Sequence, residues 1–197
     1  MKLYSFPVAP NPARVEFYLA EKGIALEKVV VNLAEGEQLS PEHLARNPKG
    51  VLPVLELNDG RYLTESVAII EFLEELHPTP PMIGTTPQER AFTRASERAI
   101  ELGVFTRIIR YVHATKSPLG LPPNPALAEN EMKFLGPNLE ALNSQLEGKQ
   151  FVMGDRVSIA DCTLLAGINF GRFGGWDIPA DQLHTRSWFE KFALRHL

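Results

Sequence analysis

Regular secondary structure is interrupted along this chain by a stretch rich in proline and glycine. Residues 77–86 contain Pro78, Pro80, Pro81 and Gly84, and neither a helix nor a strand accommodates that composition. The residues before it alternate between strand-like and helix-like patterns, whereas those after it are helical in pattern. The sequence therefore predicts an α/β domain over residues 1–77, a linker at 78–86 and an all-helical domain over 87–197.

The first domain is predicted to follow the order β-α-β and then β-β-α. Residues 3–6 indicate a short strand, and Asn11-Pro12 marks a helix start, because asparagine caps helices and proline suits their first position. Residues 26–31 predict a second strand, whose three consecutive valines favour burial. The remaining predicted elements are a short helix at 41–46, a hairpin turn at 58–60 and a helix over 67–76.

Capping signals mark the helix starts of the second domain. The segments 86–89 (Thr-Pro-Gln-Glu) and 158–161 (Ser-Ile-Ala-Asp) match the capping box, in which a hydroxyl residue and an acidic residue three positions later bond each other's main-chain N–H groups. Asn124-Pro125 marks another start. The helices are predicted to run to about Thr115, towards Gly148 and through Ile168, with a short last helix around 188–195.

Composition excludes several classes of function. The chain has 20 basic and 24 acidic side chains, so no basic face is expected for nucleic acid or an anionic membrane. The first residues lack the apolar core of a signal peptide, and no window holds the roughly 20 apolar residues of a membrane span. We therefore expect a cytoplasmic protein that binds neither nucleic acid nor membranes.

A metal site is not expected either. The single cysteine, Cys162, allows neither a disulfide nor a cysteine-based zinc site, and its apolar helical surroundings predict a buried structural thiol. The five histidines are scattered, with no spacing typical of metal ligands.

The first candidate ligand-binding feature is a proline at the start of an apolar strand. The run from Asn47 to Leu55 places Pro53 there, with Gly50 three residues ahead. We interpret Leu52-Pro53 as a cis peptide bond, which would leave the main-chain N–H and C=O of Leu52 free to pair with an extended, peptide-like ligand. The alternative is an ordinary trans proline that begins an edge strand.

The second feature lies 12 residues further on, at a helix start. Thr64-Glu65-Ser66 ends a strand and opens a helix, whose first N–H groups have no partner within the helix and so favour an anion. The main-chain N–H and hydroxyl of Ser66 are candidates to hold a carboxylate, and Glu65 to accept from an ammonium group. Together they suit the α-amino acid end of a ligand, although a Glu-Ser pair can also be a plain helix cap.

The order of these motifs resembles the glutathione S-transferase superfamily, bacterial members in particular. The resemblance rests on Asn47 to Leu55, the Glu65-Ser66 pair and the capping box at 158–161, together with the runs 9–15 and 19–24, and it extends over essentially the whole chain. It implies a thioredoxin-like first domain, an all-helical second domain, and glutathione as a co-substrate with no metal.

The resemblance also implies how glutathione would lie on the first domain. Its cysteine would pair with the main chain of Leu52 beside Pro53, and its γ-glutamyl end would rest on Glu65 and Ser66. Its thiol would point at the start of the first helix, where the helix dipole and a donor side chain favour thiolate over thiol. The thiolate would then attack a small electrophile.

One departure from the family pattern concerns the residue that faces the sulfur. Related proteins often carry Ser, Thr, Cys or Tyr near this point, whereas this chain has Ala9, which has no side-chain donor. The nearest polar candidate is Asn11, with its oxygen capping the helix and its amide N–H facing the sulfur. We predict Asn11 as the catalytic residue; the alternative is an N-cap with no part in catalysis. Tyr4 and Ser5 are disfavoured, since they lie within the strand.

Electrophile binding is implied on the loop after the first strand and on the long helices of the second domain. The predicted residues are Phe6, Val8, Phe105 and Tyr111. Arg107 and Arg110 suggest an anionic or polar acceptor, although two charges on a helix often form a solvated face.

Two functions remain open at this stage. One is a glutathione transferase that conjugates glutathione to electrophiles, with peroxidase or disulfide reductase activity as a further possibility and with isomerisation or dehalogenation not separable by sequence. The other, motivated by Ala9, is a non-catalytic member of the fold that binds glutathione or a protein. The resemblance also implies a homodimer, with the helix that follows Glu65-Ser66 near the partner's long helix that begins at Pro87.

Overall fold

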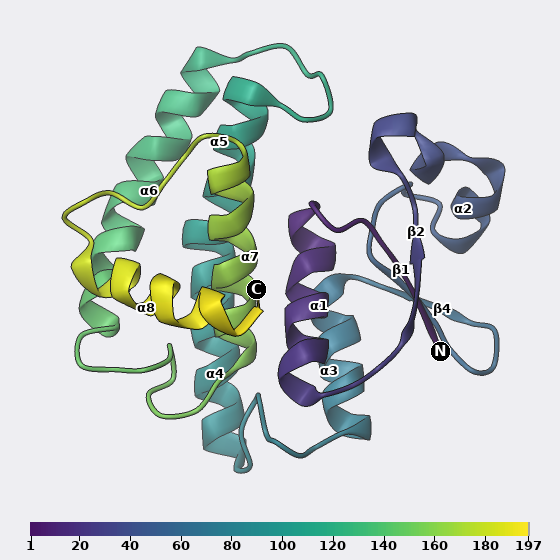
Figure 1. Cartoon of the computed structure of the whole chain (residues 1–197), viewed down its shortest axis with the longest axis horizontal. Coiled ribbons are helices and arrows are strands. Elements are labelled where there is room, and N and C mark those ends of the chain that lie inside the picture. Colours follow the sequence, from purple (N-terminus) through teal and green to yellow (C-terminus); the bar gives the residue numbers. More distant parts are fainter. Residues whose placement is uncertain (197) are drawn as a thin grey trace. The chain divides into compact units, whose positions relative to one another are not determined.

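The computed structural model describes residues 1–196 and divides the chain into two compact units. The first unit is Met1–Pro80 and the second begins at Pro81, so the division falls within the proline-rich stretch. The first unit combines a sheet with helices, and the second is built from helices (Figure 1). This mixed α/β unit followed by a helical unit confirms the predicted fold class.

The first unit is a small mixed sheet whose helices include a packed pair, α1 and α3. Its elements are β1 (Lys2–Ser5), α1 (Pro10–Lys22), β2 (Glu27–Val30), η1 (Leu33–Glu35), η2 (Glu37–Leu39), α2 (Pro41–Arg46), β3 (Val54–Glu56), β4 (Tyr62–Thr64) and α3 (Ser66–Leu76). The strand order is β2-β1-β3-β4, with β1 parallel to β2 and the other pairs antiparallel. Helices α1 and α3 pack together on one side of the sheet (Figure 1). Their apolar faces and the inner strands form the core, in which Leu3, Val15, Leu55, Ile69 and Leu73 are fully buried.

Two predictions for this unit are wrong in detail. The second strand is at the edge of the sheet, where Val30 is 60% exposed, so the run of valines does not indicate a buried strand. Helix α1 begins at Pro10 with Ala9 as its N-cap, so Asn11 lies in the first turn and is not the cap. A proline at the first helical position needs no N–H partner, which lets the helix start one residue before Asn11.

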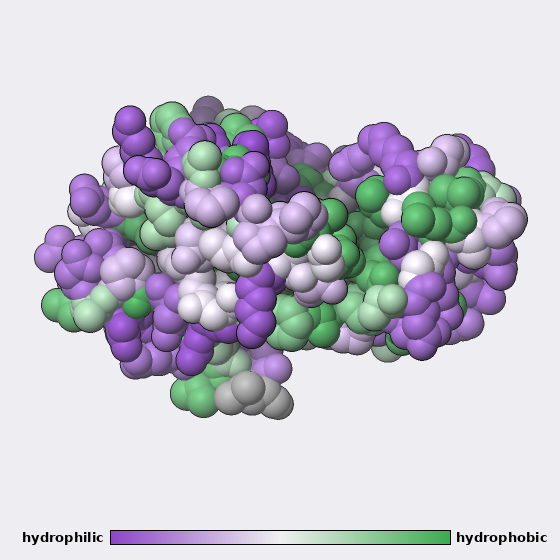
Figure 2. Space-filling view, turned by 90° about the horizontal axis from the view of Figure 1, so that it is seen from above, coloured by the Kyte–Doolittle hydropathy of each residue, from purple (hydrophilic) through white to green (hydrophobic). Residues whose placement is uncertain are grey.

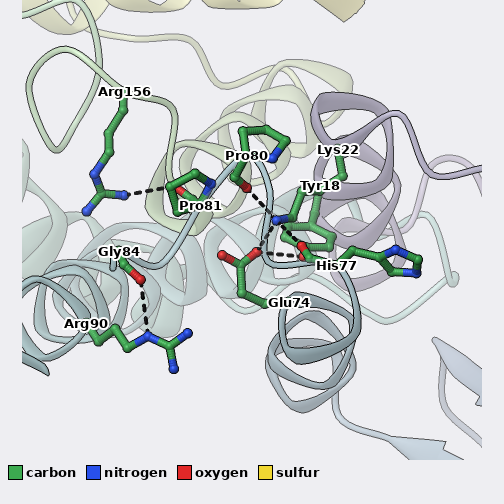
Figure 3. Close-up of polar contacts among 9 residues, drawn as sticks. All are labelled: Tyr18, Lys22, Glu74, His77, Pro80, Pro81, Gly84, Arg90 and Arg156. Carbon is green, nitrogen blue, oxygen red and sulfur yellow. Dashed lines mark hydrogen bonds and ion pairs between the residues drawn. The ribbon is translucent and has the colours of Figure 1, made fainter. Parts of the chain in front are cut away.

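The segments on either side of the unit boundary are each held by their own unit (Figure 3). In the first unit, the Lys22 ammonium donates to the carbonyl oxygens of His77 and Pro80, each at 2.5 Å, and forms a buried ion pair with Glu74 at 2.7 Å. In the second unit, Arg156 donates to the carbonyl oxygen of Pro81 at 3.4 Å.

The second unit contains α4 (Pro87–Ile100), a π-helical turn η3 (Glu101–Phe105), α5 (Thr106–Lys116), α6 (Pro125–Gln145), α7 (Ile159–Phe173), α8 (Leu183–Ala193) and η4 (Leu194–His196). Helix α7 packs against α4, α5 and α8, and most of its residues are buried, Cys162 included. The capping box at Thr86–Glu89 and the cap at Asn124 form as predicted.

Asp161 is the centre of a buried hydrogen-bond network at the start of α7. Its carboxylate accepts from the main-chain N–H and hydroxyl of Ser158, from the main-chain N–H of Val152, and from the indole N–H of Trp188, at 2.8 to 2.9 Å. The carboxylate therefore bonds α7 to α8 and to the loop before α7, as well as capping its own helix.

Helix α8 begins five residues before the predicted start at Trp188. The side-chain oxygen of Asn143, in α6, accepts from the main-chain N–H groups of His184 and Thr185 at 2.9 and 3.1 Å. The cap of this helix comes from a residue about 40 positions away, and so it leaves no local pattern in the sequence.

No helix within residues 1–196 combines the length and the apolar character needed to span a membrane. Figure 2 shows one face of the molecule, where hydrophilic side chains cover much of the surface and apolar ones gather in several small patches among them. Apolar atoms make up a large share of any protein surface.

Candidate functional site

The first turn of α1 carries the predicted catalytic residue, Asn11. The N-cap Ala9 makes no side-chain capping bond. The side-chain oxygen of Asn11 accepts from the Arg14 guanidinium, Nη2 to Oδ1, at 2.8 Å. Arginine only donates hydrogen bonds, so the carbonyl oxygen of the Asn11 amide faces Arg14 and its NH₂ group is directed elsewhere. The residue is therefore held in an orientation that presents a donor.

Arg14 also contacts the second predicted feature, the start of α3. This side chain is 4% exposed, and its Nε donates to the Ser66 hydroxyl at 2.7 Å. The Ser66 hydroxyl lies 3.4 Å from the Asn11 side-chain oxygen. Asn11, Arg14 and Ser66 thus form one polar cluster. A single guanidinium joins the starts of two helices through a bond between residues 52 positions apart.

Ser66 is nearly fully buried, at 3% exposed, and its hydroxyl is engaged with Arg14. Glu65, the N-cap of α3, is exposed, and its carboxylate accepts from Lys49 at 2.9 Å. Its φ of +66° makes it the one non-glycine residue with positive φ within residues 1–196. Such a conformation costs roughly 1–3 kcal/mol and concentrates at ligand-binding sites. The backbone at the start of α3 is therefore strained beside the polar cluster.

The loop before β3 presents the main chain of Leu52. The Leu52-Pro53 peptide bond is cis, as predicted. Within residues 1–196, the N–H and C=O groups of Leu52 have no main-chain hydrogen-bond partner. The residue before Leu52 is fixed by two side chains. The Val51 carbonyl oxygen accepts from the Asn47 side-chain amide at 2.9 Å and lies 3.3 Å from the buried His43 ring.

The hydroxyl groups of β1 are occupied within the first unit. The Tyr4 hydroxyl donates to Glu56 at 2.7 Å, and the Ser5 hydroxyl donates to Glu16. Burial and the hydrogen bond to Glu56 raise the pKa of Tyr4 to about 12, so its phenol stays protonated at neutral pH. Neither group is placed to activate a ligand thiol.

The four predicted electrophile-binding residues have different surroundings. In the first unit, Val8 is 41% exposed, and Phe6 is partly buried against a small cluster around Tyr4 and Leu52. In the second unit, Tyr111 is partly exposed on α5, whereas Phe105 is 2% exposed and packs against Gly167. Core packing is thus the role that its position favours for Phe105.

Arg107 and Arg110 are both paired within the second unit. Glu131, a fully buried residue of α6, accepts from Arg107 at 2.9 Å and lies 3.2 Å from Arg110. The two arginines are therefore neither a purely solvated face nor a pair of cations held free for an anionic acceptor.

No metal centre is formed among residues 1–196, because no group of three or more His, Cys, Asp or Glu side chains is arranged to hold an ion. In the first unit, the groups that are open to a ligand are the starts of α1 and α3 and the Leu52 main chain.

Known proteins share both units. Residues 3–81 match the model of the glutathione S-transferase N-terminal domain, and residues 108–195 match that of the C-terminal domain. The chain is 34% identical to glutathione S-transferase 2 of Saccharomyces cerevisiae over 99% of its own length and 86% of the relative's. The chain belongs to the glutathione S-transferase family.

Further relatives agree with this family assignment. The crystal structure of Gtt2 from Saccharomyces cerevisiae superposes with a TM-score of 0.89 at 32% identity, covering 97% of this chain and 95% of that one. The maleylacetoacetate isomerase of Pseudomonas aeruginosa is 33% identical over 84% of this chain and 78% of its own length. Proteins named as transferases and as isomerases are therefore both similar to this member of the family.

Sequence reasoning did not find Arg14, nor the role of His43 and Asn47 behind the Leu52 loop. A buried arginine in an amphipathic helix looks like any other charged position, since its partner Ser66 is distant in the sequence. The spacing of three between Asn11 and Arg14, which places two side chains on one helix face, was the local signal that could have drawn attention to it.

Proposed function

We propose that this chain is a glutathione transferase whose first unit binds glutathione and favours its thiolate for attack on small electrophiles. The observation that carries the proposal is the Asn11–Arg14–Ser66 cluster, which joins the start of α1 to the start of α3. The family assignment indicates glutathione as the ligand. The cluster lies where we assign its thiol and its γ-glutamyl carboxylate.

The γ-glutamyl end of glutathione is assigned to the start of α3. There the carboxylate accepts from the unpaired N–H groups of the first turn, beginning with Ser66. The Ser66 hydroxyl accepts from Arg14, and its proton remains available, because its contact with Asn11 is long for an O–H donor. The exposed Glu65 carboxylate accepts from the ligand's ammonium group. The cysteine of glutathione pairs with the main-chain N–H and C=O of Leu52, beside Pro53.

The thiol is assigned to the start of α1. The helix dipole favours negative charge there, and the Asn11 side-chain amide donates to the sulfur. Each unit by which the thiol pKa falls corresponds to about 1.4 kcal/mol of preference for the thiolate. Asn11 is a neutral donor, so its contribution is smaller than that of a charged one.

The remaining parts of the proposal follow from the family. Phe6 and Val8 are the electrophile contacts that we assign in the first unit. In the second unit the candidate is Tyr111, and Phe105 packs in the core of that unit. The enzyme is a homodimer and works in the cytoplasm, where a chain with one buried cysteine needs no oxidising conditions. Sedimentation that shows a dimer at micromolar concentration would support this assembly, and a monomer would contradict it.

The test compares turnover of 1-chloro-2,4-dinitrobenzene and of cumene hydroperoxide by the wild type and by Asn11→Ala. We expect kcat to fall by roughly tenfold, since a hydrogen bond to a charged group such as the thiolate contributes about 1.5–3 kcal/mol and a neutral donor lies at the lower end. The thiol pKa of bound glutathione, followed by thiolate absorbance, should rise in parallel. Asn130→Ala, an exposed asparagine of α6, is the matched control.

Each outcome of this comparison has a definite meaning. Unchanged kcat and thiol pKa in Asn11→Ala would remove Asn11 from the mechanism. Retention on immobilised glutathione without turnover of either substrate would favour a non-catalytic binder over an enzyme. Turnover of the hydroperoxide alone would identify a peroxidase and contradict conjugation as the activity.

A further inference from the structure

A cavity in the second unit carries a set of polar side chains that the proposed function does not use. It has a volume of about 540 Å³ and lies between one face of α8 and the turn that follows α6. Helix α8 contributes His184, Ser187, Trp188 and Lys191, which have the spacing i, i+3, i+4 and i+7 of a single helix face. The turn contributes residues 146 and 148–150.

The walls of the cavity are fixed by buried contacts. Asn143 of α6 accepts from the main-chain N–H groups at the start of α8, which fixes His184 against α6. The Trp188 indole donates to the buried Asp161 at 2.9 Å. Gly148 reverses the chain with a φ of +68°, and this turn places Lys149 and Gln150 at the cavity. The polar groups are therefore carried on a preformed framework.

The charge of the cavity is of one sign, although the chain as a whole has a net charge of −4. Among residues 1–196, the lysines Lys149 and Lys191 line it and no acidic residue does. Within residues 1–196 neither lysine forms an ion pair, and the side chains of Ser187, Gln150 and His184 make no hydrogen bond. Glu190, also on α8, lines a different cavity. The side-chain donors of these two lysines and of Ser187, Gln150 and His184 thus have no acceptor within residues 1–196.

We propose that this cavity binds a small phosphate monoester. Two ammonium groups match the charge of a phosphate dianion, and the hydroxyl, amide and imidazole groups can donate to its remaining oxygens. The volume exceeds that of a free phosphate ion and lies in the range of small-molecule sites. The lining has both polar and apolar surface, so the cavity suits a ligand that joins a charged group to a small carbon body.

The test is calorimetric titration of the full chain with ribose 5-phosphate, with ribose and inorganic phosphate as comparison probes. We expect ribose 5-phosphate to bind, ribose to show no heat, and inorganic phosphate to bind more weakly than the ester. Amide NMR shifts caused by the ester should concentrate in residues 146–150 and 184–191.

Variants of the two lysines test whether the phosphate ester binds in this cavity. The double variant Lys149→Gln with Lys191→Gln should lose about tenfold or more in affinity, because a hydrogen bond to a charged group contributes more than a neutral one. The matched control, Lys116→Gln with Lys133→Gln, removes two exposed lysines that do not line the cavity and should bind as the wild type does. Lys191→Arg keeps the charge and should retain binding.

Melting temperatures of all variants show whether the fold is intact. Equal affinity in the two double variants, or shifts centred outside the cavity, would overturn the proposal. Binding of inorganic phosphate as tight as that of the ester would overturn the assignment of an ester. Glutathione retention should be the same in every variant, so a failure here is separate from a failure of the proposed function.

Discussion

A single guanidinium connects the two helix starts of the candidate site. Arg14 is buried, with Ser66 on one of its nitrogen atoms and Asn11 on another. Ala9 has no side-chain donor, so the proposed chemistry at the start of α1 depends on the orientation of the Asn11 amide. At the scale of the residue, Arg14 is therefore a positioning residue, because it acts on the thiol through Asn11.

The variant Arg14→Met tests this positioning role. It removes the hydrogen bonds to Asn11 and Ser66. The loss of the one that orients Asn11 should lower kcat by about tenfold to a hundredfold, the range that corresponds to a charge-assisted bond of 1.5–3 kcal/mol. The thiol pKa of bound glutathione should rise and KM for glutathione should increase, which spectrophotometric titration and steady-state kinetics measure. Arg61→Met, at an exposed arginine of the β3–β4 hairpin, is the control. A lower melting temperature with an unchanged thiol pKa would show a purely structural role.

At the scale of the element, α7 organises the second unit. It is almost wholly buried, and its capping residue Asp161 bonds α8 and the preceding loop as well as its own first turn. The capping box was visible in the sequence because both partners lie within three residues. The bonds from Val152 and Trp188 were not visible, since they come from residues 9 and 27 positions away.

Removal of the Asp161 carboxylate should therefore lower the free energy of unfolding by more than the loss of a helix cap does. In Asp161→Ala the buried N–H groups of Val152 and Trp188 lose an acceptor, each at roughly 1–3 kcal/mol, so the loss in free energy of unfolding should be on the order of 3 kcal/mol or more. Ser158→Ala removes the cap hydroxyl and its hydrogen bond to Asp161 but keeps the bonds from Val152 and Trp188, so it should lower the free energy of unfolding by only about 1 kcal/mol. Urea unfolding measures both values, and equal losses would show that the network beyond the cap contributes nothing.

At the scale of the whole molecule, the first unit ends in a buried ion pair. Lys22 and Glu74 have side chains that are 0% and 2% exposed, and Tyr18 also donates to Glu74, at 2.8 Å. The lysine holds the carbonyl oxygens of His77 and Pro80, so it fixes the end of the unit against α1. This ammonium group is thus part of the fold and is not a ligand for an external anion.

Lys22→Met should weaken this end of the first unit. Breaking a buried pair leaves a carboxylate without its cation, which costs about 3–5 kcal/mol. We expect a lower melting temperature and faster proteolysis within residues 77–86, detected by mass spectrometry of the fragments. Lys28→Met breaks a pair with Glu16 whose lysine is 47% exposed and should change neither. Equal cleavage in the two variants would contradict the anchoring role.

The sequence correctly predicted the elements that depend on contacts between residues close together in the chain. The hairpin turn before β4, the helix at Pro41–Arg46 and the caps of α4 and α6 were all predicted, because each depends on residues within a few positions. Predictions failed where the position or the cap of an element depends on a residue far away in the sequence. Strand order makes β2 an edge, and Asn143 caps α8. In the candidate site, Leu52, Glu65 and Ser66 were identifiable, whereas Arg14 depends on a contact across 52 residues.

Adjacent carbonyl oxygens at Pro80 and Pro81 are held by basic side chains of different units, Lys22 and Arg156. A chimera joined between these two prolines would leave each carbonyl with the basic side chain of its own half, because Lys22 and Pro80 lie before the junction and Pro81 and Arg156 lie after it. A junction a few residues later would take Pro81 from one parent and residue 156 from the other, so this hydrogen bond would then depend on a second protein.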